Sequence, residues 1–141
     1  WFFAFFFILL TAGGFNRIYL NYAHDYYDYG GGAKISGKVD AIDFVYEDAK
    51  NVPFNVLVFM PPIYTYPYEY LFAWHGKNRY GYVPGNEKEG TFYLIMEPDP
   101  QKPWSYKGWQ ETVIKSGEVV WMKTLPSGTI VEKRIAPLTQ D

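Results

Sequence analysis

The sequence predicts an α/β fold: a small parallel or mixed sheet flanked by helices, with a C-terminal antiparallel hairpin and an N-terminal apolar helix of the membrane type. Three observations predict it. Residues 54–60 and 91–96 are nearly all apolar and rich in strand-forming types, as in strands buried on both faces. Segments with helical spacing alternate with them, which is typical of parallel sheets covered by helices. The chain also opens with ten unbroken apolar residues.

Composition excludes several classes of function. The 141 residues carry 13 Lys+Arg against 15 Asp+Glu, a net charge of -2, so a nucleic-acid partner bound by phosphate neutralisation is not expected. Because 48% of the residues are hydrophobic, intrinsic disorder is not expected either. The chain has no cysteine, which excludes disulfides, thiolate zinc sites and cysteine nucleophiles.

The apolar run at residues 1–15 is interpreted as the outer half of a membrane helix cut from a longer protein. No basic segment precedes it, as a secretory signal would require. Arg17, Tyr19, Tyr22 and Tyr26 follow, and these residue types favour the membrane–water interface. A buried core helix is the alternative, although the run lacks the polar face that such a helix normally keeps. Residues 1–15 would therefore contact membrane lipid or sister apolar helices.

Charge and glycine spacing divide the chain and orient it. The flank after the apolar run holds one arginine and two aspartates, so it lacks the basic excess of cytoplasmic flanks and favours the extracytoplasmic face. Residues 30–32 are three glycines, which predict a flexible joint. We expect an apolar helix and aromatic interfacial segment at 1–29, a linker at 30–32 and a soluble α/β domain at 33–141.

Helical elements of the domain are predicted from periodicity and capping. An apolar stripe at spacings of three and four predicts a helix over 35–49, capped by Ser36; its inward residues are Ile35, Val39, Ile42, Tyr46 and Ala49. A second helix is expected from Pro67 to His75, with Gly76 just past its end. A third fits residues 104–116, with Trp109, Val113 and Tyr106 facing inward.

Strand elements complete the prediction. Besides the two buried strands, residues 80–83 suggest a short strand before a Pro-Gly-Asn turn. Residues 119–122 and 130–133 flank Leu125-Pro126-Ser127-Gly128, a pattern that predicts a hairpin.

Two proline-rich segments leave the carboxyl ends of the buried strands, which is where open α/β sheets bind ligands. They are residues 61–70 and 97–104. Aromatic faces beside carboxylates suit a sugar, so the sequence predicts a surface that faces glycan or lipid headgroups. Its candidate residues are Tyr64, Tyr66, Tyr68, Glu97, Asp99 and Trp104. Two alternatives stay open: that the tyrosines pack back onto helices, and that Glu97 and Asp99 form a glycosidase acid pair or cap the next helix.

Other candidate sites find less support in the sequence. Asp40, Asp43 and Glu47 share one helix face and are interpreted as a solvated surface. His24 and His75 lack metal-ligand spacing, and His75 is explained by a helix C-terminus that favours a cation. Dinucleotide, P-loop and serine-nucleophile motifs do not occur. We therefore expect no metal and no cofactor.

Residues 35–135 resemble the C-terminal soluble tail of bacterial membrane glycosyltransferases of the protein-mannosyltransferase and aminoarabinose-transferase type. The stretches that carry the resemblance are 39–50 leading into 54–59, then 62–72 and 97–100. The resemblance rests on overall sequence character and not on a catalytic signature.

The resemblance implies an enzyme that takes sugar from a polyprenyl-phosphate donor at the outer face of the membrane. In that family the catalytic acids lie in an early extracytoplasmic loop, which this chain does not match. No catalytic residue is therefore predicted here, and the implied role is to cover the active site or to contact acceptor glycan. Two alternatives stay open: an anchored module that binds glycan or protein, and a structural subunit that assembles through its apolar helix.

Overall fold

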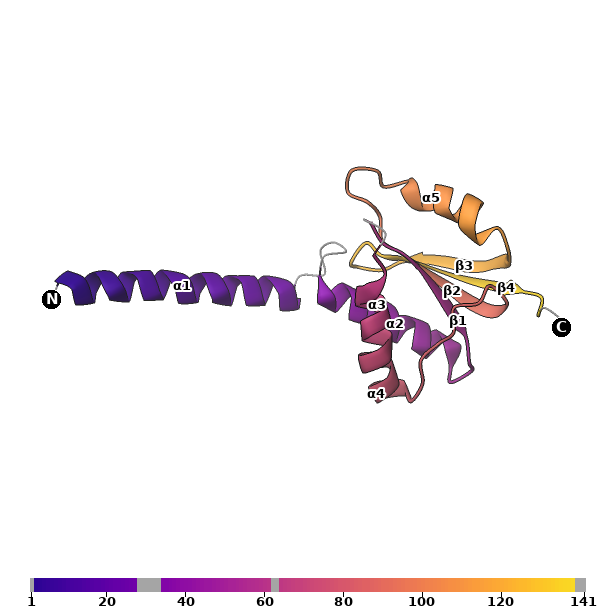
Figure 1. The fold of residues 1–141 in the computed structure, drawn as a ribbon, viewed down its shortest axis with the longest axis horizontal. Helices are drawn as coiled ribbons and strands as arrows, with labels where there is room; N and C mark the ends of the chain where they lie inside the picture. Colours follow the sequence, from indigo (N-terminus) through magenta and orange to yellow (C-terminus); the bar gives the residue numbers. More distant parts are fainter. Residues whose placement is uncertain (1, 28–33, 62–63, 139–141) are drawn as a thin grey trace.

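The computed structural model describes residues 2–27, 34–61 and 64–138. Figure 1 shows one long N-terminal helix and an α/β body. In chain order the elements are α1 (Phe2–Tyr27), α2 (Ile35–Ala49), β1 (Asn55–Phe59), α3 (Tyr66–Leu71), the π-helical turn η1 (Phe72–Gly76), α4 (Lys77–Tyr80), β2 (Gly90–Met96), α5 (Ser105–Trp109), the π-helical turn η2 (Gln110–Ile114), β3 (Glu118–Thr124) and β4 (Ile130–Ala136).

The body is built on a four-stranded mixed sheet in the order β1-β2-β4-β3. Strands β1 and β2 are parallel, with Phe59 opposite Met96, while β4 is antiparallel to both β2 and β3. The α/β class, the mixed sheet and the C-terminal hairpin predicted from the sequence are confirmed. Strand β1 lies at an edge, so only Val56 is fully buried; its two faces still pack against the two hydrophobic clusters, through Val56 and Val58 on one side and Leu57 and Phe59 on the other, so the predicted burial on both faces is partial.

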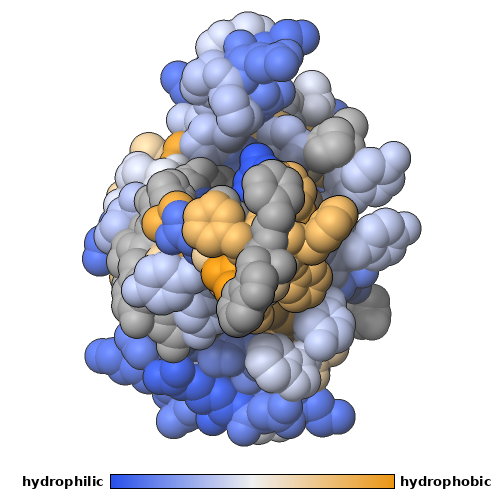
Figure 2. Space-filling model, turned by 90° about the vertical axis from the view of Figure 1, so that its left-hand side faces the viewer, coloured by the Kyte–Doolittle hydropathy of each residue, from blue (hydrophilic) through white to orange (hydrophobic). Residues whose placement is uncertain are grey.

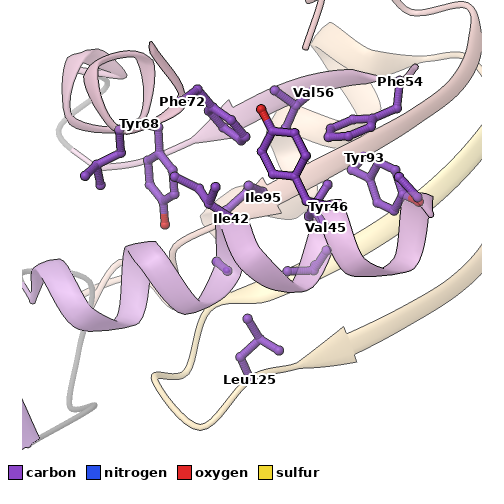
Figure 3. Packing of buried hydrophobic residues seen from close by; sticks show 14 residues of the cluster. Ile42, Val45, Tyr46, Phe54, Val56, Tyr68, Phe72, Tyr93, Ile95 and Leu125 are labelled. Atoms are coloured by element: carbon purple, nitrogen blue, oxygen red, sulfur yellow. The ribbon is translucent and has the colours of Figure 1, made fainter. Parts of the chain in front are cut away.

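Two hydrophobic clusters hold helices against the two faces of the sheet (Figure 1). Figure 3 shows the larger one, in which side chains of α2 and of the next helix, among them Ile42, Tyr46, Tyr68 and Phe72, face the sheet. The sheet contributes Val56, Tyr93 and Ile95. The smaller cluster joins α5 and η2 to the other face through six buried residues: Phe92, Leu94, Met96, Ile114, Ile130 and Ala136. The alternation of side chains along β2 explains both clusters, because successive residues point to opposite faces.

Helix α2 follows its predicted stripe except at its start. Ile42, Tyr46 and Ala49 are buried and Val39 is half-buried, as the periodicity requires. Ile35 is 69% exposed, so its predicted inward position is wrong. The helix begins at Ile35 after Lys34, so Ser36 is inside it and is not its N-cap. Gly37 and Lys38 of the same first turn are buried instead.

The second helix of the body is longer than predicted. Elements α3, η1 and α4 are contiguous and form one helix over residues 66–80, which ends at Gly81 with φ 87°. Gly76 lies inside this helix, where the ring of Tyr46 from α2 packs against it. A Cβ at residue 76 would lie 2.6 Å from Tyr46 Oη, so the close contact explains a glycine within the helix. The predicted end at His75 is therefore wrong, and residues 80–83 form no strand. An isolated bridge joins Gly85 to Asn55 of β1 instead.

Near the end of the third helix, the inward position is one residue later than predicted. Ile114 is buried and Val113 is 45% exposed, whereas Tyr106 and Trp109 pack partly buried against the smaller cluster. The π-helical turn η2 accounts for the shift, since a wider turn rotates the residues after it relative to α-helical spacing.

Helix α1 has the length and apolar composition of a membrane-spanning helix. It continues through Gly13 and Gly14 to Tyr27, and its apolar window Phe3–Ala23 has 21 residues, none of them buried. At 1.5 Å per residue this window is roughly 32 Å long, about the thickness of a bilayer's hydrocarbon core.

The predicted interfacial residues and linker are only partly described. Arg17, Tyr19 and Tyr22 are exposed on α1 and lie inside its apolar window, not after it. The side chain of Tyr26 and the predicted linker at 30–32 lie outside the described residues.

Candidate functional site

The carboxyl ends of β1 and β2 lie side by side, as expected for the predicted ligand-binding edge. Phe59 and Met96 are paired at the ends of the two strands, and the amide of Glu97 donates to the carbonyl of Phe59 at 2.9 Å. The proline-rich segments that begin at Pro61 and Glu97 therefore leave the sheet from neighbouring positions.

A buried charged cluster closes this edge of the sheet. Lys38 Nζ donates to Glu97 Oε1 at 2.6 Å, and the Tyr68 hydroxyl donates to the same oxygen at 2.7 Å. All three residues are buried. Burial, followed by the charge of Glu97 and the hydrogen bond to it, raises the pKa of Tyr68, so its hydroxyl stays protonated and donates. The cluster fixes the first turns of α2 and α3 to the end of β2.

An open pocket of about 370 Å³ lies over this cluster. Lys38 and Glu97 line it together with apolar side chains: Met60, Pro61, Pro67, Pro98 and Pro100. Its stiff proline wall around one ion pair could accept a small group that is largely apolar and carries a few polar atoms.

The six residues predicted to bind glycan separate into three environments. Tyr68 and Glu97 are beneath the surface in the charged cluster. Asp99 is half-buried and accepts a hydrogen bond from the amide of Gln101 at 2.8 Å, so it forms a turn. Tyr64, Tyr66 and Trp104 are 61%, 70% and 65% exposed and are available to a ligand. Glu97 is buried and ion-paired with Lys38, whereas Asp99 is half-buried in a turn, so the two acids lie in different environments.

A row of exposed aromatic rings follows the outer side of helix 66–80. We call Tyr64, Tyr66, Tyr70 and Trp74 the aromatic row. The Tyr64 and Tyr66 rings lie 6.3 Å apart and the Tyr70 and Trp74 rings 6.2 Å apart, with 15° between the ring planes in both pairs. Each of the four residues is more than half exposed. An uncovered row of large rings is the kind of surface that takes a partner or ligand.

Sequence reasoning missed two members of the aromatic row. Tyr70 and Trp74 continue from Tyr66 at spacings of four, while Tyr68 and Phe72 alternate with them and are buried. Residues four apart lie on one helical face, so this spacing was the signal that could have found the row. The predicted helix, Pro67 to His75, already contained both residues.

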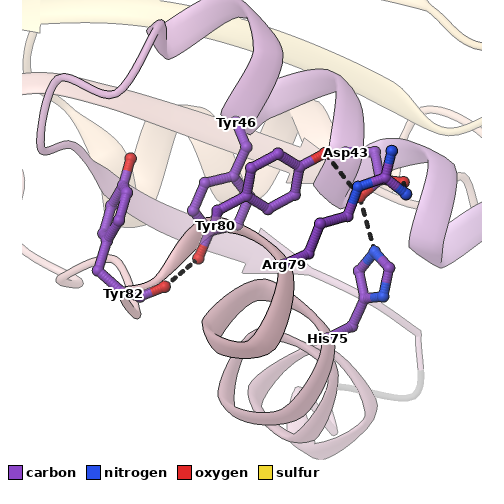
Figure 4. A network of polar contacts seen from close by, with 6 residues as sticks. All are labelled: Asp43, Tyr46, His75, Arg79, Tyr80 and Tyr82. Carbon is purple, nitrogen blue, oxygen red and sulfur yellow. Dashed lines mark hydrogen bonds and ion pairs between the residues drawn. The ribbon is translucent and has the colours of Figure 1, made fainter.

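A second polar network joins helix 66–80 to α2, as Figure 4 shows. Asp43 receives bonds from three side chains: its Oδ1 lies 2.7 Å from His75 Nε2 and 3.0 Å from the Tyr80 hydroxyl, and its Oδ2 lies 3.1 Å from Arg79 Nη1. Burial and then the hydrogen bond to Asp43 raise the pKa of Tyr80 to about 12. Asp43 is thus a structural acceptor, and its interpretation as part of a solvated surface is wrong.

Stacked tyrosines lie beside Asp43 and add further contacts between α2 and helix 66–80. The Tyr46 and Tyr80 rings are 4.3 Å apart and nearly parallel, and the Tyr46 hydroxyl donates to the carbonyl of Tyr82 at 2.6 Å. His75 lies mid-helix, so a helix C-terminus does not explain it; its bond to Asp43 does. The network holds the helix that carries the aromatic row in a fixed position.

The described ranges, 2–27, 34–61 and 64–138, contain no group of three His, Cys, Asp or Glu side chains placed to hold a metal. Comparisons with protein-family models, with curated proteins and with solved structures find no match to this chain.

Proposed function

We propose that this chain is a non-catalytic accessory domain of a membrane glycosyltransferase that uses a polyprenyl-phosphate-linked sugar. In this proposal α1 anchors the domain, the body lies on the extracytoplasmic face, and the aromatic row contacts the acceptor glycan or covers the active site. The glycosyltransferase part rests on the resemblance of residues 35–135 to the tail domains of such enzymes.

The aromatic row is the observation that carries the glycan part of the proposal. Sugar rings present C–H groups that stack on aromatic faces, and their hydroxyls bond to polar groups at the edge. Tyr70 and Trp74 provide nearly parallel rings; Glu69 directly precedes Tyr70 in the chain, and His75 directly follows Trp74. The Asp43 network fixes the helix, so the backbone loses little conformational freedom when a ligand binds.

The test is titration of the full chain in lipid nanodiscs with mannohexaose and with chitohexaose, followed by calorimetry and tryptophan fluorescence. We expect saturable binding of at least one of them. Trp74→Ala and Tyr70→Ala should each weaken binding by about tenfold or more, which is about 1.4 kcal/mol. Met122→Ala, a matched change at an exposed apolar residue of β3, should leave the affinity unchanged. Equal affinities in all three variants would contradict a role for the row in glycan binding.

The parent enzyme is tested separately. The reading frame upstream of Trp1 should encode further hydrophobic spans and an extracytoplasmic loop that carries carboxylates. A start codon and a basic segment directly upstream would favour the anchored binding module, which could use the same row for glycan or protein.

The exposure of α1 favours one other candidate, a structural subunit. None of the apolar window Phe3–Ala23 is buried, so sister helices could cover it as well as lipid could. Electron microscopy of the full chain in detergent-free buffer distinguishes the structural subunit from the membrane-anchored domain. Regular assemblies would favour the subunit, and dispersed monomers would exclude it.

A further inference from the structure

One end of the body gathers the start of α2 and the carboxyl ends of the parallel strands. Lys38 of the first turn of α2 bonds to Glu97, which follows β2, and Ile130 at the start of β4 pairs with Met96 at the end of β2. Residues 34–35, the loop 97–104 and the turn 125–129 therefore lie at the same end, as Figure 1 shows. We call these three segments the basal end.

The chain connection ties the basal end to the end of α1. Helix α1 ends at Tyr27 and α2 begins at Ile35, so eight Cα–Cα steps separate them. Those steps span at most about 30 Å. If α1 crosses a bilayer, the start of α2 is held within that distance of the point where α1 leaves the hydrocarbon. The opposite end of the body, which includes Val52 and Gly90, is then directed away from the membrane.

Exposed side chains at the basal end match a headgroup layer. Ile35 and Trp104 are 69% and 65% exposed, which is unusual for such large apolar residues unless another surface covers them. Lys102, two residues before Trp104 in the chain, is also exposed. Figure 2 looks at the molecule from this side with α1 pointing toward the viewer, so the orange apolar side chains near its centre are those of α1 in front of the body.

The charges at this end favour an anionic partner. Asp99 accepts a hydrogen bond from the Gln101 amide, and Glu69, on α3 nearby, accepts one from Thr65 Oγ1. In the loop 97–104, Glu97 is paired with buried Lys38, and Lys102 is the exposed charged residue. A lysine beside exposed aromatic and aliphatic side chains is the combination that binds anionic lipid surfaces.

We propose that the basal end rests on the anionic headgroup layer of the bilayer that α1 spans. Trp104 and Ile35 lie at the level of the headgroups, and Lys102 faces lipid phosphates. This arrangement rests on the membrane anchoring in the proposed function but not on the glycosyltransferase assignment. In this orientation the carboxyl ends of β1 and β2 face the membrane, and the pocket lined by Lys38 faces it too.

The absence of cysteine allows a direct test with single labels on the full chain. A nitrobenzoxadiazole fluorophore is attached at Gln101→Cys in the basal end or at Val52→Cys, a 59% exposed control at the opposite end. Vesicles contain phosphatidylcholine and phosphatidylglycerol at 7:3, with a nitroxide on a fraction of the headgroups. We expect at least threefold stronger quenching at residue 101 than at residue 52. Equal quenching would overturn the proposal.

Charge reversal and an anchoring control complete the test. Lys102→Glu should reduce the quenching at residue 101 at least twofold, and 0.5 M salt should do the same, because salt screens exposed charges. Lys50→Glu, at the opposite end, should not change it. A label at Ala12→Cys on α1 is read with nitroxides on the acyl chains. No quenching there would overturn both the anchoring and this proposal, whereas quenching at 12 without quenching at 101 would overturn this proposal alone.

Discussion

Lys38 Nζ lies 2.6 Å from Glu97 Oε1, and both side chains are buried at the carboxyl edge of the sheet. This pair joins the first turn of α2 to the end of β2, and Tyr68 adds α3 to the same oxygen. Three elements that are distant in the sequence are therefore fixed where the predicted ligand-binding loops begin. Breaking a buried pair leaves an uncompensated charge, whereas replacing both partners does not.

The first prediction concerns this ion pair. Glu97→Gln should lower the free energy of unfolding by about 3–5 kcal/mol, because Lys38 would stay buried without an anion. The double change Lys38→Met with Glu97→Leu should cost clearly less than Glu97→Gln. Chemical denaturation of the full chain in detergent micelles, followed by near-UV circular dichroism, measures both. Glu69→Gln on the exposed side of α3 is the control and should cost less than about 0.5 kcal/mol. A double variant as unstable as Glu97→Gln would show that apolar packing cannot replace the pair.

The second prediction concerns the close approach of α2 to helix 66–80. In Gly76→Ala the new Cβ would lie 2.6 Å from Tyr46 Oη, so Tyr46 must shift away from Tyr80 and Tyr82. We expect a loss of about 1–3 kcal/mol in unfolding free energy, as for other overpacked cores. Gly108→Ala in α5 meets nothing within 4 Å and should instead stabilise by about 0.5–1 kcal/mol. The same denaturation experiment compares the two alanines, and equal effects would argue against the tight contact.

The third prediction is a pair of opposite pH effects on one helix. Burial opposes ionisation of Asp48, but hydrogen bonds from Lys133 and Tyr93 outweigh it and lower its pKa below 3.8. The stability that Asp48 contributes is therefore present above its unfolded pKa and is lost as pH falls through its lower folded value. Burial, followed by repulsion from Asp43, raises the pKa of Asp40 above 3.8. Ionised Asp40 therefore costs stability at neutral pH, and that cost disappears in acid.

Asparagine variants measure the two effects. At pH 7, Asp48→Asn should destabilise by about 1 kcal/mol and Asp40→Asn should stabilise by less than about 1 kcal/mol, since solvent screens both sites. Both differences from the parent chain should shrink toward pH 3. Denaturation midpoints at pH 3, 5 and 7 provide the comparison. The assignment of the two carboxylates is contradicted if both variants shift stability in the same direction at pH 7.

The elements that the sequence predicts correctly are those whose pattern follows from local geometry. Residues 92–96 are apolar or aromatic at every position because β2 has helices on both sides, and the hairpin follows from two apolar-rich segments that flank a Pro-Ser-Gly turn. Helix α2 follows from its spacing of buried residues. These features depend on side chains near in sequence, so a pattern can reveal them.

The features that the sequence hid depend on contacts between distant elements. Gly76 reads as a helix stop, but Tyr46 packs against it and the helix continues. Asp43 reads as a surface acid, but it becomes an acceptor once His75, Arg79 and Tyr80 are brought to it. Of the predicted site, Tyr64, Tyr66 and Trp104 are exposed, as a ligand would need. Tyr68 and Glu97 are buried because they bond to each other and to Lys38, which comes from an element distant in the sequence.

The central claim is that α1 spans a bilayer and anchors the α/β body to it. Single labels at Ala4→Cys, Ala12→Cys and Ala23→Cys along α1, read against nitroxides at the headgroup and at the bilayer centre, measure the depth of the helix directly. A spanning helix predicts that residue 12 is quenched most strongly from the bilayer centre and residues 4 and 23 from the two headgroup layers. Equal, weak quenching at all three positions would contradict the claim and leave α1 to be covered by sister helices.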